Sequence, residues 1–193
     1  MAEREFKCVQ GCSDCCVTRE YYPSKKFGKI GVLLLPDEVP RIQGLAHKNG
    51  VDVRILPRIA TGTRLPDTIV AYQMMGVKED GDLCPFLDTT SGTRSPHGGH
   101  ACTIYGERPR ACKAYPLIDD AGSGLDGHCR FCKEFSTATA NPNSIKAEAE
   151  ALAEIRQAVN VPDNSMRVWR YATATGSIED KDGMFSEGWV IEG

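Results

Sequence analysis

Long apolar runs, an excess of either charge and a secretory signal are all lacking from this 193-residue chain. Its longest apolar run, residues 30–35, suits a strand and falls well short of the about 18 residues that a membrane-spanning helix needs. The 23 Lys and Arg residues nearly balance 26 Asp and Glu residues, which argues against a broad nucleic-acid surface. Residues 1–5 are charged and lack the apolar core of a signal peptide. We therefore expect a cytoplasmic protein with no membrane insertion and no nucleic-acid partner.

The usual sequence signs of catalysis are also missing. No Gly-rich cofactor loop follows a predicted strand, no nucleophile stands beside a base, and no carboxylate pair stands out. No internal repeat is apparent, and a chain of this length can form one domain with its own core. The sequence therefore leans away from an enzyme, and its chemistry must come from a bound group.

Cysteine is the residue that the chain has in quantity. Nine of the 193 residues are cysteine, and four of them lie between residues 8 and 16. An odd number of thiols, clustered in a reducing compartment, favours metal binding over disulfides. All nine are candidate metal ligands: Cys8, Cys12, Cys15, Cys16, Cys84, Cys102, Cys112, Cys129 and Cys132.

The spacing of these cysteines points to soft, sulfur-preferring metals. The first run reads Cys-x3-Cys-x2-Cys-Cys, which places three sulfurs around one small region. Neighbouring side chains diverge on a helix and alternate on a strand, so we expect Cys15 and Cys16 to point in different directions. The run would then supply two sites or leave one sulfur free. Downstream, Cys129-x2-Cys132 has a spacing shared by zinc and iron–sulfur sites.

Two kinds of metal centre suit these ligands. Zinc and a 4Fe–4S cluster both accept four thiolates, so the chain could hold one or two 4Fe–4S clusters, with zinc as the alternative. The spacing of Cys8, Cys12 and Cys15 favours iron–sulfur, but the sequence does not fix which thiols share a site. Arg108 and Arg110 would either offset the negative charge of a thiolate cluster, as cofactor-binding residues, or pair with surface carboxylates.

Apolar periodicity and turn residues predict an α+β fold. Strands are expected over residues 29–35, 51–59, 68–78 and 83–87, helices over 13–20, 37–48 and 144–159, and short elements after residue 109 and over 166–171. They form a small, mostly antiparallel sheet with flanking helices, beside a loop-rich half stapled by metal. Residues 1–171 form this single metal-binding domain. Residues 172–193 form a tail with one Lys against five Asp and Glu, which docks either on this domain or on a partner.

Three separated motifs resemble a known family. They are the cysteine run at residues 8–16, then Cys84-Pro85-Phe86-Leu87, then Cys102-x-Ile104-Tyr105-x2-Arg108-Pro109-x2-Cys112-x2-Tyr115-Pro116. In this order, over residues 6–135, they are similar to the CxxCxxCC family of zinc- or iron-chelating domains, although the first gap is one residue longer here. The resemblance implies a cysteine-bound metal, commonly taken to be iron–sulfur. Some larger relatives are associated with lysine methylation of flagellin.

Three functional hypotheses follow from these observations. The first is a 4Fe–4S protein that acts as a small redox or oxygen-responsive accessory subunit and docks on a larger protein or enzyme complex. The second is a structural zinc module for protein–protein interaction. The third is a protein-modifying enzyme associated with lysine methylation, and it rests on the resemblance alone because the sequence offers no catalytic constellation.

Overall fold

The computed structural model describes residues 4–17, 21–24, 27–77, 83–118, 124–160, 165–173 and 187–191, and within them the chain is an α+β protein. The α-helices are α1 (Asp14–Val17), α2 (Glu38–Asn49), α3 (Arg110–Ala114), α4 (Arg130–Phe135) and α5 (Lys146–Val159). The strands are β1 (Tyr21–Ser24), β2 (Gly28–Ile30), β3 (Val32–Leu34), β4 (Ile55–Gly62), β5 (Thr68–Met74), β6 (Leu87–Asp88), β7 (Ala101–Cys102), β8 (Arg167–Ala172) and β9 (Gly188–Ile191). Two 3₁₀ turns, η1 (Tyr105–Glu107) and η2 (Pro142–Ile145), precede α3 and α5.

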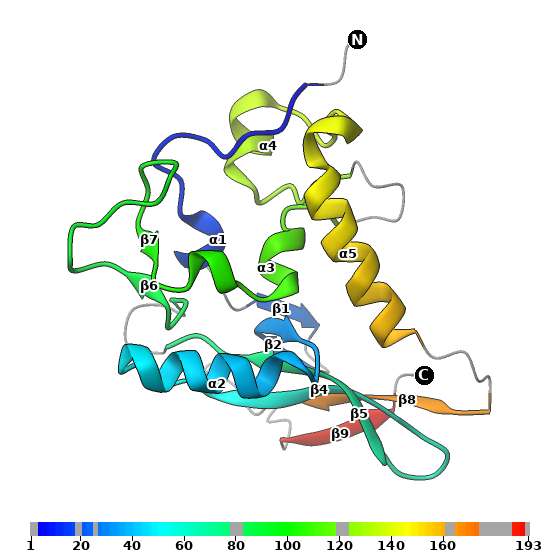
Figure 1. The fold of residues 1–193 in the computed structure, drawn as a ribbon. Coiled ribbons are helices and arrows are strands. Elements are labelled where there is room, and N and C mark those ends of the chain that lie inside the picture. The colour runs from blue at the N-terminus through cyan, green and yellow to red at the C-terminus, as the bar shows by residue number, and fades with distance from the viewer. Residues whose placement is uncertain are drawn as a thin grey trace, which may run out of the picture.

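Five antiparallel strands form the main sheet, in the order β3-β5-β4-β8-β9. Figure 1 shows this sheet at one end of the molecule, with α1, α3, α4 and the loops at the other end. The two C-terminal strands extend the sheet beyond the predicted residues 29–87. In this added part, Trp189 packs edge to face on Tyr171 with ring centroids 5.2 Å apart. Strand β9 of the acidic tail therefore docks on its own domain.

Helix α2 lies across one face of the sheet (Figure 1). Its apolar positions recur with helical spacing, and Ile42, Leu45 and Ala46 are buried in a core shared with β3 and β5. Gly50 ends the helix in the left-handed conformation, and its N–H donates to the carbonyls of Ala46 and His47. This helix and its glycine stop are confirmed.

Helix α5 runs from the end that carries α4 down to the sheet (Figure 1). Its Ala151 and Ile155 pack with Ala114 of α3 and with Leu33 of β3. The helix begins later than predicted because residues Pro142–Ile145 form the turn η2, whose N-terminus is capped by the side chain of Asn141. Packing between α3 and α5 connects a cysteine-bearing helix to the sheet.

Several predicted strand boundaries are wrong. The strand expected over residues 29–35 is split at Gly31, where a Cβ would lie 2.2 Å from the carbonyl oxygen of Met74. Strand β4 begins at Ile55, and β5 ends at Met74. The predicted pairing of residues 83–87 with the preceding strand is reduced to a single bridge between Val77 and Leu83. The turn predicted at residues 79–82 lies outside the described residues.

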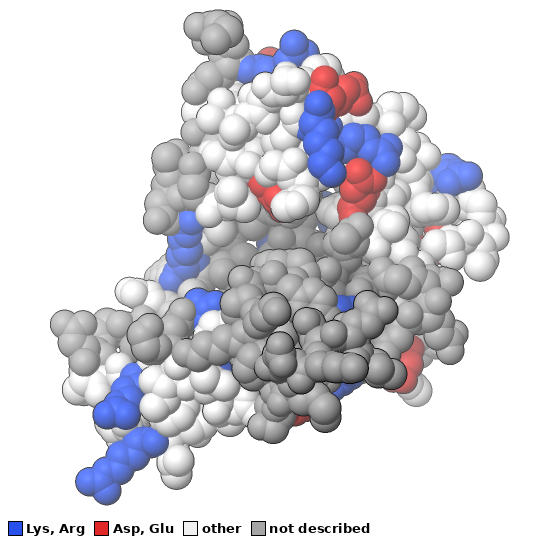
Figure 2. Space-filling view, turned by 180° about the vertical axis from the view of Figure 1, so that it is seen from behind, with Lys and Arg blue, Asp and Glu red and all other residues white. Residues whose placement is uncertain are grey.

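Charges of both signs cover the described surface. Figure 2 shows acidic and basic side chains side by side on the upper part of the rear face. None of the helices in the described ranges is long and apolar enough to cross a membrane.

Candidate metal centre

Five cysteines line one cavity above the sheet. They come from four segments, namely α1, the turn before β6, the end of β7, and α3, and they are Cys15, Cys16, Cys84, Cys102 and Cys112. The other lining residues are mostly apolar or aromatic: Met74, Phe86, Ile104, Pro109 and Tyr115, with Arg108 as the one cation among them. Cysteines far apart in the sequence thus line one space, in which Cys84 is buried and the other four are half-buried.

Backbone hydrogen bonds hold these segments together. The N–H of Cys84 donates to the carbonyl of Cys16 at 2.8 Å, which joins the turn before β6 to α1. Phe86 is fully buried, and its carbonyl accepts the N–H of Thr103 at 2.9 Å. Strands β6 and β7 pair, so Cys102 lies beside the same turn. The cysteine backbones are therefore positioned by the fold itself.

The adjacent cysteines Cys15 and Cys16 lie on the same side of α1. Their Sγ atoms are 3.8 Å apart and both residues line the cavity, so the prediction that they point in different directions is wrong. Helix α1 has only four residues, which leaves room for the two side chains to turn toward each other. Cys16 packs against the core formed by α2, β3 and β5, while Cys15 interacts electrostatically with Cys8, Cys12 and Cys102.

The two candidate arginines have different surroundings. Arg108 lines the cysteine cavity, where its guanidinium lies 4.0 Å above the ring of Tyr105. Arg110 is not among the residues of that cavity, and it forms ion pairs with Asp37 at 3.0 Å and Glu154 at 2.8 Å. Arg110 thus pairs with carboxylates, whereas Arg108 faces the thiols, and the role of either as a cofactor-binding residue stays a prediction.

The four other cysteines gather where the N-terminal segment meets α4. They are Cys8 and Cys12 on that segment, Cys129 at the N-cap of α4, and Cys132 within α4. Cys129 interacts electrostatically with Cys132 and Cys12, whereas Cys8 interacts with Cys15, Cys12 and Arg108. Cys129 and Cys132 are buried, whereas Cys8 is exposed. Five of the nine predicted ligands thus line the cavity, and Cys8 and Cys15 connect them to the cysteines near α4.

Backbone N–H groups point at three of the sulfurs. Cys12, Cys102 and Cys129 each accept a hydrogen bond from the N–H of the residue two positions later. Such bonds stabilise the negative charge of a thiolate, which is the form that binds metals. The same local geometry recurs in both groups.

Desolvation opposes this effect in the metal-free protein. Although Cys8 keeps exposed surface, loss of water around its sulfur raises its pKa to about 11, and burial does the same for Cys129. Burial also raises the pKa of Cys12, Cys102 and Cys132. These groups are therefore protonated thiols near neutral pH, and a metal must displace their protons.

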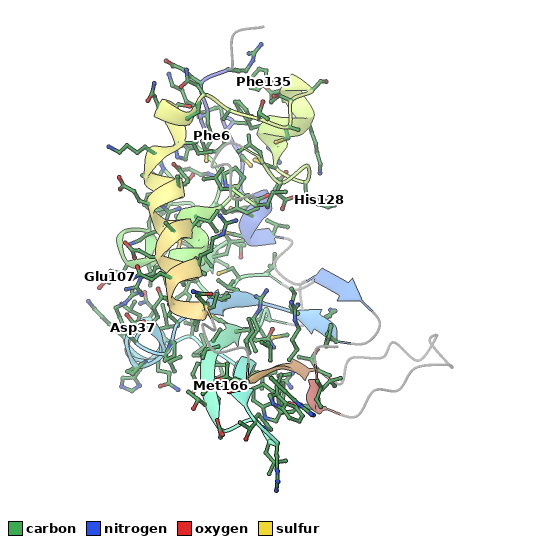
Figure 3. The ribbon with its side chains drawn as sticks, turned by 90° about the vertical axis from the view of Figure 1, so that its right-hand side faces the viewer. Phe6, Asp37, Glu107, His128, Phe135 and Met166 are labelled. Carbon is green, nitrogen blue, oxygen red and sulfur yellow. The ribbon has the colours of Figure 1, made fainter. Side chains whose placement is uncertain are left out.

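The histidines face away from the sulfurs or bond through their backbone. The side chain of His128 is 92% exposed and bonds Asp126 at 3.0 Å, and Figure 3 shows it pointing out from the molecule. In the loop at residues 97–100, the carbonyl of His97 accepts the N–H of Gly11, and the N–H of His100 donates to the hydroxyl of Ser13. This loop supports the cysteine run by main-chain contacts.

The sulfurs surround a space and do not meet at one point. Within the described ranges, no three Cys, His, Asp or Glu side chains are gathered closely enough to hold a single ion. The donor set nonetheless suits zinc or iron–sulfur, because both groups present soft thiols in numbers that complete a four-ligand shell. Binding would rearrange these side chains on backbones that the fold already holds in place.

Comparison with known protein families supports a metal site formed by these cysteines. The model of the family CxxCxxCC, described as a putative zinc- or iron-chelating domain, matches residues 7–150. The chain belongs to the CxxCxxCC family. The matched region contains all nine cysteines and extends into α5. No curated protein and no solved structure matches the chain.

Sequence reasoning missed several residues that build this CxxCxxCC site. Ile104 and Tyr115 line the cavity, and both belong to the motif that carries the family resemblance, so that motif was the available signal. Asp14 forms an ion pair with Arg130 at 2.5 Å, and nothing in the sequence pairs these distant residues. Met74 was predicted as core, and it is buried there with 1% exposure.

Proposed function

We propose that the protein is an iron–sulfur protein that acts as a small redox or oxygen-responsive accessory subunit of a larger enzyme. The observation that carries this proposal is the cavity that five cysteines surround. A zinc ion sits at the common point of four touching ligands, whereas a 4Fe–4S cluster has volume and takes one thiolate at each iron. Cysteines that line a common space without converging on one point favour the cluster, and the cavity, with a volume of about 30 Å³, must widen to hold it.

Packing supports a choice of four ligands from the five. Cys16, Cys84, Cys102 and Cys112 pack against the core of α2, β3 and β5, whereas Cys15 is not among the residues of that core. We assign these four as cluster ligands. Cys15 is then the ninth cysteine, which two four-thiolate sites would leave over.

The walls of the cavity suit a redox centre. When bound, the cluster would supply one-electron exchange. Apolar walls from Met74, Phe86 and Ile104 would exclude water, and the Arg108 guanidinium would offset the negative charge of the thiolates. These are the levers by which a protein sets a cluster potential.

Exposed apolar residues next to the cavity support the docking part of the proposal. Val17 follows Cys16 in the chain, and Tyr105 stacks on the cavity residue Arg108; both are exposed. Exposed apolar and aromatic residues of this kind are enriched in protein interfaces. A partner that covers them would lie within a few residues of the cluster ligands.

Anaerobic purification tests the proposal. The expected product is brown, contains iron and sulfide in equal amounts, and loses its visible absorbance in air and on reduction with dithionite. Replacing Cys112 with Ser is expected to remove this absorbance. A colourless protein that carries zinc and no iron would instead establish the structural zinc module.

Two arginine variants provide a matched pair for the redox part. Arg108→Gln removes a positive charge beside the thiols and should lower the reduction potential, because the added electron loses a favourable neighbour. Arg110→Gln removes the same charge two residues away, outside the cavity, and should leave the potential unchanged. Equal shifts in the two variants would contradict the assignment of the cluster to this cavity.

A further inference from the structure

Cys15 and Cys16 form a pair of thiols that touch each other. Their Sγ atoms are 3.8 Å apart, and both residues line the cysteine cavity. Both are half-buried, and the next residue, Val17, is exposed. The pair therefore lies side by side at a point that a molecule as small as hydrogen peroxide can reach.

The short helix that carries the pair can rearrange at low cost. Helix α1 has four residues, of which none is buried, and the N–H groups of Cys16 and Val17 donate to the carbonyl of Ser13 at 2.8 and 3.1 Å. A disulfide needs Sγ atoms about 2.05 Å apart, and between adjacent residues its ring includes their peptide bond. Closure therefore rotates this peptide and breaks the bond between the Cys16 N–H and Ser13. A single helical turn is marginal by itself, so the change costs less here than within a long helix.

The other closely spaced pair, Cys129 and Cys132, is less accessible to an oxidant. Both residues are buried, and they pack in an apolar cluster with Leu117 and Phe131. A buried thiol reacts slowly, because oxidation requires access as well as a thiolate. Oxidation of the metal-free protein should therefore select the adjacent pair in α1.

We propose that Cys15 and Cys16 are a site of reversible oxidation, at which hydrogen peroxide converts the two thiols into a vicinal disulfide. One thiol attacks the peroxide and takes one oxygen as a sulfenic acid, which releases a first water. The neighbouring thiol then displaces a second water, so one S–S bond replaces both S–H bonds and the two electrons pass to the peroxide. A dithiol reductant restores the thiols by exchange, and strain in so small a ring favours this reduction.

The disulfide assigns a role to Cys15. In the proposed iron–sulfur site Cys16 is a ligand, and Cys15 is the cysteine that the ligand sets leave over. A disulfide between them removes Cys16 from the ligand set until a reductant acts, and it protects Cys16 from irreversible oxidation to a sulfinic acid. This regulation of the site rests on the proposed function, whereas formation of the disulfide does not.

Peptide mapping of the reduced, metal-free wild-type protein tests the disulfide. The protein is treated with an equimolar amount of hydrogen peroxide, its remaining thiols are alkylated, and trypsin then releases residues 8–19 as one peptide with four cysteines. Cys8 and Cys12 should carry the label, while Cys15 and Cys16 should be joined and unlabelled. Dithiothreitol before alkylation should restore both missing labels. Label on all four cysteines, or a disulfide that includes any other cysteine, would overturn the proposal.

Two serine variants provide matched controls in the same cysteine run. With excess peroxide, Cys12→Ser should form the vicinal disulfide as the wild type does. Cys15→Ser should instead give a Cys16 sulfinic acid that dithiothreitol does not reverse. Full recovery of the Cys16 thiol in Cys15→Ser would contradict a protective role for Cys15.

Iron uptake separates this inference from the proposed function. Peroxide-treated wild-type protein should bind iron and sulfide again only after reduction, because Cys16 must be a thiol to bind iron. A vicinal disulfide in a protein that never binds iron would overturn the proposed function and leave the oxidation site in place. Iron binding by a protein that forms no such disulfide would overturn this inference alone.

Discussion

Removal of the buried carboxylate of Glu38 should weaken both the fold and the metal centre. Glu38 is 1% exposed at the start of α2, where its carboxylate accepts the N–H of Leu35 at 3.0 Å and the N–H of Arg110 at 2.9 Å. It also accepts from the Arg41 guanidinium at 3.3 Å. Arg110 is the first residue of α3, the helix that carries Cys112. Glu38 thus connects α2 to α3, the helix that carries Cys112, through a backbone hydrogen bond and not through the cysteine itself.

The size of the effect follows from the groups that lose their partner. In Glu38→Ala, two backbone N–H groups lose a charged acceptor, at about 1–3 kcal/mol each if they stay buried. Arg41 and Arg110 are 38% and 30% exposed and keep other partners, so water can relieve much of their loss. We expect a total of about 3–5 kcal/mol, which is a large part of the about 5–15 kcal/mol of a typical domain. Glu38→Gln keeps one acceptor oxygen and should cost about 1–3 kcal/mol.

Urea unfolding of the metal-free protein measures this cost, with metal content as a second readout. The control is Glu154→Gln, which removes a carboxylate that pairs with the same Arg110 but is 61% exposed; it should cost less than about 1 kcal/mol. Glu38→Ala should also lower the metal content of purified protein, since α3 loses its anchor. If Glu38→Ala and Glu154→Gln unfold within about 1 kcal/mol of each other, Glu38 does not anchor α3.

Four further outcomes are expected. Metal binding should release protons, and its affinity should increase as pH rises. The reason is that desolvation raises the pKa of Cys8 and Cys129 to about 11, and each thiol must lose its proton to bind a metal. A pH indicator in weak buffer measures the proton release. In the folded, metal-free protein these pKa values are raised from 9.0 to about 11, so folding favours the protonated thiols. The free energy of unfolding should therefore decrease between pH 9 and 11. Unchanged urea midpoints over that range would contradict this. Gly99→Ala should cost about 2 kcal/mol or more and lower the metal content, because its Cβ would lie 2.2 Å from the Cys12 carbonyl oxygen. Gly44→Ala, where a Cβ meets no atom within 4 Å, should keep the metal content of the wild type. Chelation should speed hydrogen exchange in α4 before the sheet, and simultaneous loss of protection in both would speak against a separately stapled half.

The sequence predicted the elements whose signal is local. Helix α2 follows from apolar residues at helical spacing and from Gly50, and α5 follows in the same way from Leu152 and Ile155. The family follows from the spacing of the cysteines and from the residues beside them, such as Pro85 and Phe86 after Cys84. In each case the residues that decide the structure lie within a few turns of each other, so a single stretch of sequence carries the information.

Features that depend on contacts between distant residues could not be predicted from the sequence. Arg108 and Arg110 differ by two positions, yet only the fold shows that one faces the thiols and the other meets the carboxylates of α2 and α5. The break at Gly31 depends on the backbone of Met74 in the neighbouring strand. The angle between Cys15 and Cys16 depends on a helix only one turn long, where ideal helical geometry no longer holds.

The nine cysteines are positioned by contacts of residues that are not themselves candidate metal ligands. Before a metal binds, the protonated thiols contribute little to the stability of the fold. Other contacts therefore have to position the cysteine backbones. In one group this support comes from the buried Phe86 and from Glu38, and in the other from the Phe6 and Asp14 contacts with α4. The contacts that position the two groups of cysteines therefore come from different elements, and Cys15 is coupled to cysteines of both groups.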